Sequence, residues 1–224
     1  MRILHISDTH SKHRELPPLP NADIIIHSGD FTFAGSENEA YDFINWFCDL
    51  PFQHKIFIAG NHDLCMYGAD SIDGLPNNVH YLCNNSIEIS NVTFFGIPLF
   101  MEDIMDGSFD RMINDIPDNT NVLITHQAPY GFCDEYSEHH CGDRALREKT
   151  DMLPSLRCHL YGHQHEANAM IACNGIIFSN AAVLDNHYNL FANSRVIELW
   201  AIPLLESFAC LEYLLIFFRL QTGR

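Results

Sequence analysis

Basic residues are scarce in this sequence: 12 lysines and arginines stand against 29 aspartates and glutamates, which gives a formal net charge of −17. Proteins that wrap long nucleic acid neutralise its phosphates with lysine and arginine, so this balance argues against that class. Nucleotides stay open as ligands, because a metal cluster inverts the local charge. We therefore expect a small substrate and no duplex nucleic acid among the partners.

Paired cysteine motifs are missing as well. The eight cysteines form no CxxC pair and no regular framework. The first predicted strand begins at Arg2, which leaves no room for a targeting segment before it. These features predict reduced thiols in a cytoplasmic protein. The length of 224 residues and the apolar content of 47% fit one domain with a sizeable core.

Short apolar segments predict a two-layer sheet sandwich flanked by helices. A helix is predicted over residues 36–50, because Ser36 and Glu39 form a capping box at its start. Two shorter helices are predicted near 109–116 and 143–150. The predicted strands cover residues 2–7, 23–28, 55–59, 79–82, 86–89, 92–96, 121–125, 157–161, 169–173, 176–178 and 195–200.

The segment 201–224 differs from the rest. Residues 202–218 are almost entirely apolar, but Glu206 and Glu212 interrupt them, and buried glutamates are costly in a membrane. We therefore expect no membrane span. A helix from about Leu204, docked on the body or on a second copy of the chain, is the favoured interpretation, so a homo-oligomer through this tail is a candidate assembly. A non-native read-through tail is the alternative.

Residue types that bind metals recur directly after five predicted strands. In open α/β sheets, ligands bind outside the carboxyl ends of strands. Side chains from all five places can therefore meet at one edge of the sheets. The five motifs are Asp8-Thr9-His10, Gly29-Asp30, Gly60-Asn61-His62-Asp63, Thr125-His126 and Gly162-His163-Gln164-His165.

Two of these motifs carry paired ligands. Asp8 and His10 are two residues apart on a segment expected to be extended, so they point the same way and can reach one ion. His163 and His165 are expected on a turn, where they can diverge to two ions.

The other three motifs supply single ligands. Asp30 can bridge two cations, Asn61 offers a neutral carbonyl oxygen, and His126 offers an imidazole. A set of seven oxygen and nitrogen ligands suits Mn, Fe, Zn, Ni or Co rather than Ca or Mg alone. Because no cysteine belongs to the set, it does not describe a cysteine-rich structural zinc site.

These five motifs, in this order, resemble the calcineurin-like metallophosphoesterase superfamily. The residues around Asp8, Asp30 and Asn61 are most similar to its MPPED-type branch. The resemblance covers residues 1–200 as one domain and leaves the apolar tail 201–224 outside it. It implies a four-layer α/β/β/α sandwich of two mixed β-sheets flanked by helices.

The resemblance also implies a role for each motif residue. It implies two divalent transition-metal ions, manganese foremost, with iron, zinc, nickel or cobalt as alternatives. Asp30 matches the bridging carboxylate, and His62 matches the residue that contacts phosphate and assists the leaving group. His62, Asp30 and Asn61 are thus the expected catalytic residues. The remaining matches are Asp8, His10 and His165 for the first metal, and Asn61, His126 and His163 for the second.

The activity implied is hydrolysis of small phosphodiesters, with cyclic nucleotides among the candidates. A hydroxide bridging the two ions would attack phosphorus in line with the leaving oxygen. A phosphomonoesterase or a nuclease on the same site is the first alternative. A metal-binding scaffold that holds partners, with weak or no turnover, is the non-enzymatic one.

One position departs from the pattern of the superfamily. Many relatives carry an acid three residues after the bridging aspartate, paired with the catalytic histidine, whereas Phe33 stands at that position here. His62 therefore needs another partner, and Asp63 is one candidate. Asp63 is equally well explained as a turn residue.

Other polar residues receive simpler interpretations. Gln127 and Tyr130 are expected at the substrate mouth, because they follow His126 in a loop. A second group in that loop has a spacing that suits no common zinc module, and its members are Cys133, His139, His140 and Cys141. Satisfied structural roles are expected for His5, His27, His54 and His80.

Overall fold

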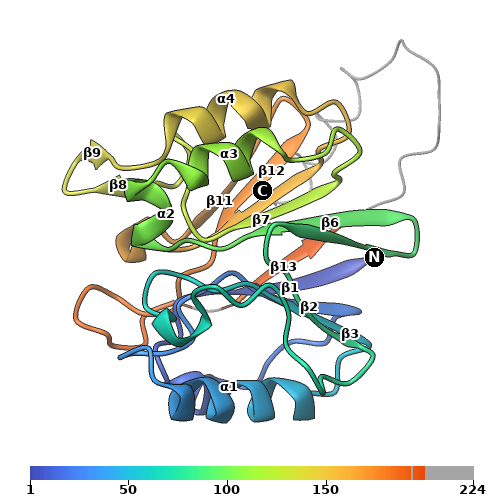
Figure 1. Cartoon of the computed structure of the whole chain (residues 1–224), viewed down its shortest axis with the longest axis vertical. Coiled ribbons are helices and arrows are strands. Elements are labelled where there is room, and N and C mark those ends of the chain that lie inside the picture. Colours follow the sequence, from blue (N-terminus) through green and yellow to red (C-terminus); the bar gives the residue numbers. More distant parts are fainter. Residues whose placement is uncertain (193, 200–224) are drawn as a thin grey trace, which may run out of the picture.

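The computed structural model describes residues 1–192 and 194–199, and its core is two β-sheets packed face to face. Helix α1 covers the outer face of one sheet, and helices α3 and α4 cover the outer face of the other (Figure 1). The four layers confirm the α/β/β/α arrangement that the motifs implied.

The first sheet has the strand order β13-β1-β2-β3-β4. Its first four strands in the chain run parallel, and β13 pairs antiparallel with β1 at the edge. Parallel strands that are covered on both faces consist of continuous apolar runs, as in Ile24-Ile25-Ile26. The strands are β1 (Arg2–Ile6), β2 (Ile24–His27), β3 (His54–Phe57), β4 (Val79–Tyr81) and β13 (Arg195–Glu198).

Helix α1 (Glu37–Asp49) begins as predicted. Both hydrogen bonds of the capping box between Ser36 and Glu39 are present. Its buried face packs Phe43 and Phe47 against Ile25 of the first sheet. The neighbours Ile24 and Ile26 point the other way, into the layer between the sheets.

The second sheet has the order β11-β12-β10-β7-β6-β5 and mixes parallel with antiparallel pairs. Helices α3 (Ser108–Asn114) and α4 (Arg144–Met152) pack Phe109 and Leu146 against this sheet. The strands are β5 (Asn85–Ile89), β6 (Val92–Ile97), β7 (Val122–Thr125), β10 (Cys158–Tyr161), β11 (Ala169–Cys173) and β12 (Ile176–Asn180).

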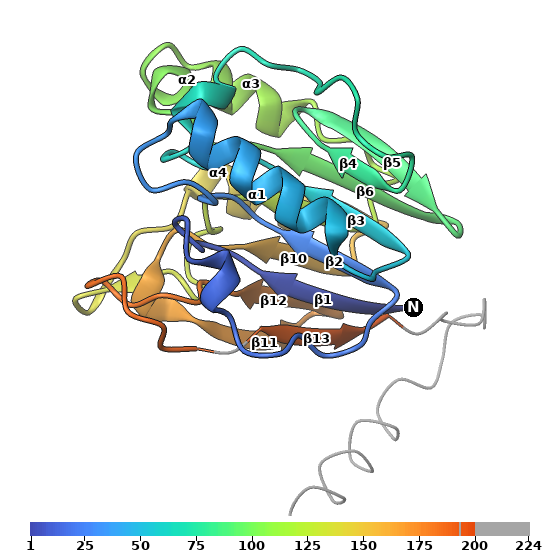
Figure 2. The same cartoon turned by 90° about the horizontal axis from the view of Figure 1, so that it is seen from below.

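Strands from both sheets end at the same edge of the sandwich. Figure 2 shows β1, β2 and β10 with their arrowheads toward one side. The loops that follow β1, β2, β3, β7 and β10 therefore lie together, and these loops carry the five motifs. Three short 3₁₀ helices lie in the connections, at His13–Glu15, Leu64–Met66 and His165–Ala167.

Neither helix α2 nor a small hairpin was expected from the sequence. Helix α2 (Met101–Met105) is too short to show a helical period, because five residues complete little more than one turn. A small hairpin, β8 (Glu135–Tyr136) with β9 (His139–His140), lies in the predicted polar loop. Its residues are exposed, so they show no apolar alternation that could predict strands.

The predicted tail helix lies outside the described residues. Within residues 1–192 and 194–199, none of the helices has both the length and the apolar character needed to cross a bilayer.

Candidate metal centre

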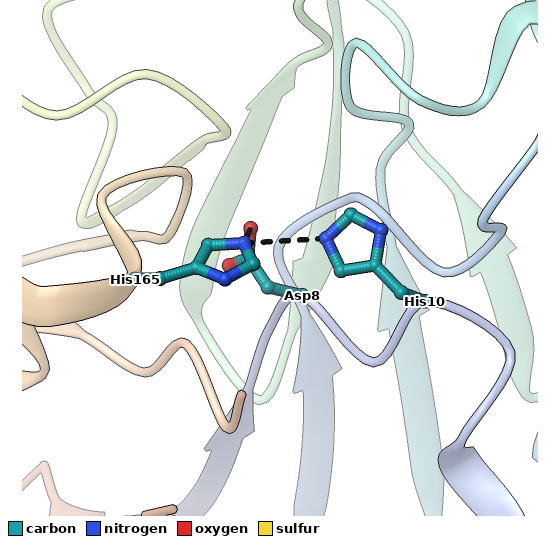
Figure 3. Close-up of side chains that lie close together, drawn as sticks. All are labelled: Asp8, His10 and His165. Atoms are coloured by element: carbon teal, nitrogen blue, oxygen red, sulfur yellow. Dashed lines mark hydrogen bonds and ion pairs between the residues drawn. The ribbon is translucent and has the colours of Figure 1, made fainter. Parts of the chain in front are cut away.

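Two loops, those after β1 and β10, bring Asp8, His10 and His165 together. One nitrogen or oxygen atom from each lies within 4.8 Å of the others. Figure 3 shows the imidazoles of His10 and His165 facing each other, with Nε2 atoms 3.2 Å apart and the Asp8 carboxylate beside His165. Asp8 Oδ1 lies 3.4 Å from His165 Nε2. This is the trio expected to hold the first metal.

A second trio consists of Asp30, His126 and His163, again with ligand atoms within 4.8 Å. His163 and His165 thus diverge to two groups. Asp30 Oδ2 lies 3.2 Å from His126 Nε2 in the second trio and 3.7 Å from His10 Nε2 in the first. Asp30 Oδ1 accepts the His62 backbone N–H at 2.8 Å, which orients the carboxylate between the two groups.

The backbone that carries these ligands is not extended. Asp8 has φ 56° and His10 has φ 39°, and Asp30 and His163 also have positive φ, at 57° and 68°. The expectation of an extended Asp8–His10 segment is therefore wrong. The Asp8 and His10 N–H groups instead donate to the carbonyls of Gly29 and Asp30, at 3.0 Å each. Such left-handed residues cost free energy and cluster at functional sites.

The histidine rings are oriented by backbone carbonyls. Nδ1 of His10 donates to Thr32 O at 3.1 Å, Nδ1 of His126 to Ser28 O at 2.8 Å, and Nδ1 of His165 to Asp185 O at 3.0 Å. A carbonyl oxygen can only accept, so each ring carries a proton on Nδ1 and turns Nε2 toward the centre. Metal-binding histidines are held in this way by a partner on their second nitrogen.

The charges of the centre also suit cations. Burial lowers the pKa of both His10 and His163 to about 4, so both rings are neutral at pH 7 and can act as ligands. Burial, the largest single effect, would lower the pKa of His126 too, but the Asp30 and Asp8 carboxylates and the Ser28 carbonyl together raise that pKa to about 10. The positive charge that His126 gains compensates buried carboxylates, which is the role that metal ions would take over.

Two buried atoms test whether the residues fit a metal. Both Asn61 Oδ1 and His126 Nε2 are inaccessible to solvent. Asn61 Oδ1 has no hydrogen-bond partner among the described residues, and His126 Nε2 lies 3.2 Å from Asp30 Oδ2 without the geometry of a hydrogen bond. Buried polar atoms are nearly always paired, so each orphan needs an explanation. A cation explains both atoms, because an amide oxygen and an imidazole nitrogen are ordinary ligands of transition metals. The residues present therefore fit the expected group.

Two motif glycines leave the space that the ligands occupy. A Cβ atom at Gly60 would overlap Asp30 Oδ1, and one at Gly162 would overlap Asp8 Oδ2. Glycine is thus required at these positions for close approach of the backbone to the ligand carboxylates.

Asp63 is a structural anchor of the centre rather than the partner of His62. Its two carboxylate oxygens accept N–H groups from Asp30, Phe31, Thr32 and Gly60, together with the Thr32 hydroxyl. The side chain is fully buried. It therefore ties the Gly60 turn to the loop that carries the bridging carboxylate.

Replacing Asp63 with alanine should lower the free energy of unfolding by about 3 kcal/mol, because several buried N–H groups lose their acceptor. Urea unfolding of the metal-free protein measures this effect. Asp118→Ala is the matched control, since Asp118 is exposed. Equal stability of the two variants would contradict the anchoring role.

His62 finds its partner in the backbone. Its Nδ1 donates to Phe33 O at 2.9 Å, which leaves Nε2 free. The His62 ring lies 4.7 Å from the His10 ring, and His62 groups with His10 and Asp30 within 4.8 Å. The backbone carbonyl of Phe33 thus orients His62. The Phe33 side chain cannot replace the acid that many relatives carry at this position.

A cavity of about 300 Å³ opens beside His163. Gln127, one of the two residues predicted at the substrate mouth, lines this cavity, and Tyr130, the other, does not. The Tyr130 ring instead lies under the Arg144 guanidinium, 3.7 Å from its centroid. The remaining lining residues are Leu99, Met101, Ile104, Gly107, Phe109, Asp110 and Asp143.

The other histidines mostly have structural partners. His5 bonds to Ser28 and Ser179, and His27 bonds to Thr9. His54 departs from expectation, because its Nδ1 is buried without a partner in the described part of the chain. In the loop after His126, His140 pairs with Asp134 at 2.7 Å.

Comparisons with known proteins agree with this geometry. The sequence profile of the calcineurin-like phosphoesterase family matches residues 1–167. The UPF0046 protein C25E10.12 of Caenorhabditis elegans is 33% identical, over 83% of this chain and 76% of its own. Human metallophosphoesterase domain-containing protein 1 is 28% identical, over 88% of this chain and 71% of its own.

A solved structure shares the fold. The crystal structure of TT1561 of Thermus thermophilus superposes with a TM-score of 0.57 at 10% identity, covering 81% of this chain and 88% of its own.

Proposed function

The chain belongs to the calcineurin-like phosphoesterase family and is a metal-dependent phosphoesterase, and we propose that it hydrolyses small phosphodiesters. The observation that carries the proposal is the position of Asp30, whose Oδ2 faces a histidine of each trio, at 3.2 and 3.7 Å. One carboxylate between two sets of ligands suits a centre of two ions. The family uses such dinuclear centres.

We assign the ligands as the motifs indicated. Asp8, His10 and His165 would hold one ion, Asn61, His126 and His163 the other, and Asp30 both. The family resemblance favours manganese, and the mixed set of oxygen and nitrogen donors also suits iron, zinc, nickel or cobalt. When bound, two such ions supply Lewis acidity toward water and the phosphoryl oxygens.

The residues of the chain supply the rest of the chemistry. The Asp30 carboxylate and the oriented Nε2 atoms would hold the two ions at fixed positions beside His62, which would keep the reacting atoms of a bound phosphoester aligned. His62 holds one proton on Nδ1 toward Phe33 O. A second proton, on Nε2, makes His62 the general acid that protonates the leaving oxygen.

The cavity beside His163 supports a diester rather than a monoester. A diester carries a second organic group that stays on phosphorus, and this group needs room next to the centre. The cavity offers about 300 Å³, with apolar walls from Leu99, Ile104 and Phe109.

Hydrolysis of bis-p-nitrophenyl phosphate and of p-nitrophenyl phosphate tests the proposal. Metal-stripped protein is re-supplied with Mn, Ni, Zn or Mg singly. We expect metal-dependent turnover of both esters, with the diester about tenfold faster in kcat/KM, since its second ring gains binding free energy in the cavity. A Gln127→Ala variant should lose part of this preference, because Gln127 lines the cavity.

Two outcomes would redirect the proposal. Preference for the monoester would favour a phosphomonoesterase on the same site. No turnover with any metal, in protein that binds two ions per chain, would favour a metal-binding scaffold. A cytoplasmic location, and a homo-oligomer through residues 201–224, belong to the same proposal and rest on the sequence.

A further inference from the structure

Aromatic side chains stand at the edge of the metal centre beside His62. Phe33 is 51% exposed, and its ring meets Tyr188 edge-on at 5.1 Å. Tyr188 also packs edge-on against two ligand histidines, 5.0 Å from His10 and 5.7 Å from His165. We call Phe33 and Tyr188 the aromatic wall. Single exposed apolar residues are common. Whether the aromatic wall has a function therefore depends on its position relative to the metal centre.

The backbone of Phe33 is held on both sides. Its N–H donates to Glu39 Oε1 at 3.1 Å, and its carbonyl accepts Nδ1 of His62 at 2.9 Å. Glu39 also accepts the Ser11 hydroxyl at 3.0 Å, so the capping residue of α1 fixes two loops at the centre. The Phe33 ring is therefore presented from a rigid segment, which lowers the entropy lost on binding.

Tyr188 is held equally firmly. Its φ of 59° is unusual for a residue with a bulky side chain. Its N–H donates to Asp185 O at 2.9 Å, and its carbonyl accepts Lys12 Nζ at 2.7 Å. Asp185 O is also the acceptor that orients His165. The loop that places the Tyr188 ring is thus the loop that places a metal ligand.

The position of His62 links the wall to the leaving group. A general acid must approach the oxygen that it protonates to about 2.6–3.2 Å. The rings of His62 and Phe33 both lie edge-on to the His10 ring, with centroids 4.7 and 6.4 Å from it, so an oxygen near His62 lies on the side of the centre that the aromatic wall borders. The organic group on that oxygen then extends along the wall. The cavity beside His163 remains for the second organic group of a diester.

The chemistry of the wall favours a flat, uncharged group. Aromatic pairs gain free energy beyond area burial through stacked or edge-to-face contact. The charged groups adjoining the wall, Lys12 and Glu39, already bind backbone atoms of Tyr188 and Phe33.

We infer that the aromatic wall binds the leaving group of the substrate, and that this group carries a flat aromatic or heteroaromatic ring. The inference rests on the proposed phosphoesterase function. It assigns to Phe33, at the position where many relatives carry an acid, a role in substrate selection. Phe33 and Tyr188 thus become specificity-determining residues of the site.

Binding of two phosphonates tests the inference without turnover. Phenylphosphonate and methylphosphonate carry a C–P bond that the enzyme does not hydrolyse, and they differ only in the ring. Calorimetric titration of the Mn-loaded full chain gives both affinities. We expect wild type to bind phenylphosphonate more tightly, and Phe33→Leu to reduce the phenyl-to-methyl affinity ratio roughly five- to tenfold.

Matched variants separate the ring from other effects. Phe33→Leu keeps the carbonyl that orients His62, so methylphosphonate affinity should not change. Phe33→Tyr should retain the ratio. Tyr41→Leu removes an aromatic ring of 64% exposure from helix α1, and it should also leave the ratio unchanged.

The results divide cleanly between the two proposals. If the protein hydrolyses the diester and Phe33→Leu leaves the phenyl-to-methyl affinity ratio unchanged, the aromatic wall does not bind the leaving group, and the proposed phosphodiesterase activity still stands. If Phe33→Leu lowers the phenyl-to-methyl affinity ratio as expected but no diester is hydrolysed, the binding role of the aromatic wall stands and the proposed phosphodiesterase activity is wrong. Equal affinities of wild type for both phosphonates, or binding of neither, would overturn the inference.

Discussion

Asp30→Asn should slow phosphoester hydrolysis by about a thousandfold, the size of effect that follows loss of a main electrostatic group. It should also lower the metal content from two ions per chain to one or none. Asn is nearly isosteric with Asp but neutral, and only one of its two polar atoms is an acceptor. Since Asp30 Oδ1 already accepts the His62 N–H, an asparagine has no oxygen left for the cations.

The experiment pairs metal analysis with kinetics. Bound metal is measured by mass spectrometry after gel filtration, and kcat/KM is measured with bis-p-nitrophenyl phosphate. Asp118→Asn is the control, because it removes the same charge from an exposed position. Two ions and a normal rate in Asp30→Asn would remove Asp30 from the bridging position.

His62→Ala should give the opposite combination, with metal retained and turnover lost. His62 Nδ1 is bonded to Phe33 O, and its side chain belongs to the trio of His10 and Asp30 without being one of the seven assigned ligands. Loss of a general acid costs about 10²–10⁴-fold in rate. We therefore expect two ions per chain in this variant, together with a drop of that size in kcat.

The leaving group sharpens this prediction. p-Nitrophenolate needs little protonation, whereas an alkoxide needs much more, so the loss in His62→Ala should be greater for an alkyl ester than for a p-nitrophenyl ester. His80→Ala is the control, because His80 lies on strand β4 and outside the three metal-binding groups. Equal losses for both esters would assign His62 to phosphate binding instead of proton transfer.

Local pattern made most of the fold predictable. The parallel strands are covered on both faces, so each appears as a short apolar run, such as Ile24-Ile25-Ile26. The start of helix α1 is predictable because Ser36 and Glu39 form a capping box, and these two residues are only three positions apart in the chain. Helix α2 and the β8–β9 hairpin carry no such signal, because they are short and largely exposed.

The candidate ligands were identifiable for a related reason. Each stands directly after a strand, and a parallel arrangement places the carboxyl ends of strands at one edge. Chain order alone therefore predicts that Asp8, Asp30 and His126 meet. It does not predict how they are held, since the left-handed φ of Asp8 and Asp30 depends on hydrogen bonds between the loops.

The sequence by itself determined the layers of the sandwich, the family and the set of side chains at the centre, because these depend on contacts within a few residues or on the order of strands. Only the tertiary structure decided the partner of His62, the anchoring role of Asp63 and the approach of Tyr188 to the site. Those depend on contacts across 29, 31 and 176 positions of the chain, from His62 to Phe33, from Asp63 to Thr32 and from Lys12 to Tyr188. A local sequence pattern cannot predict contacts between residues so far apart in the chain, because only the folded structure brings these loops together.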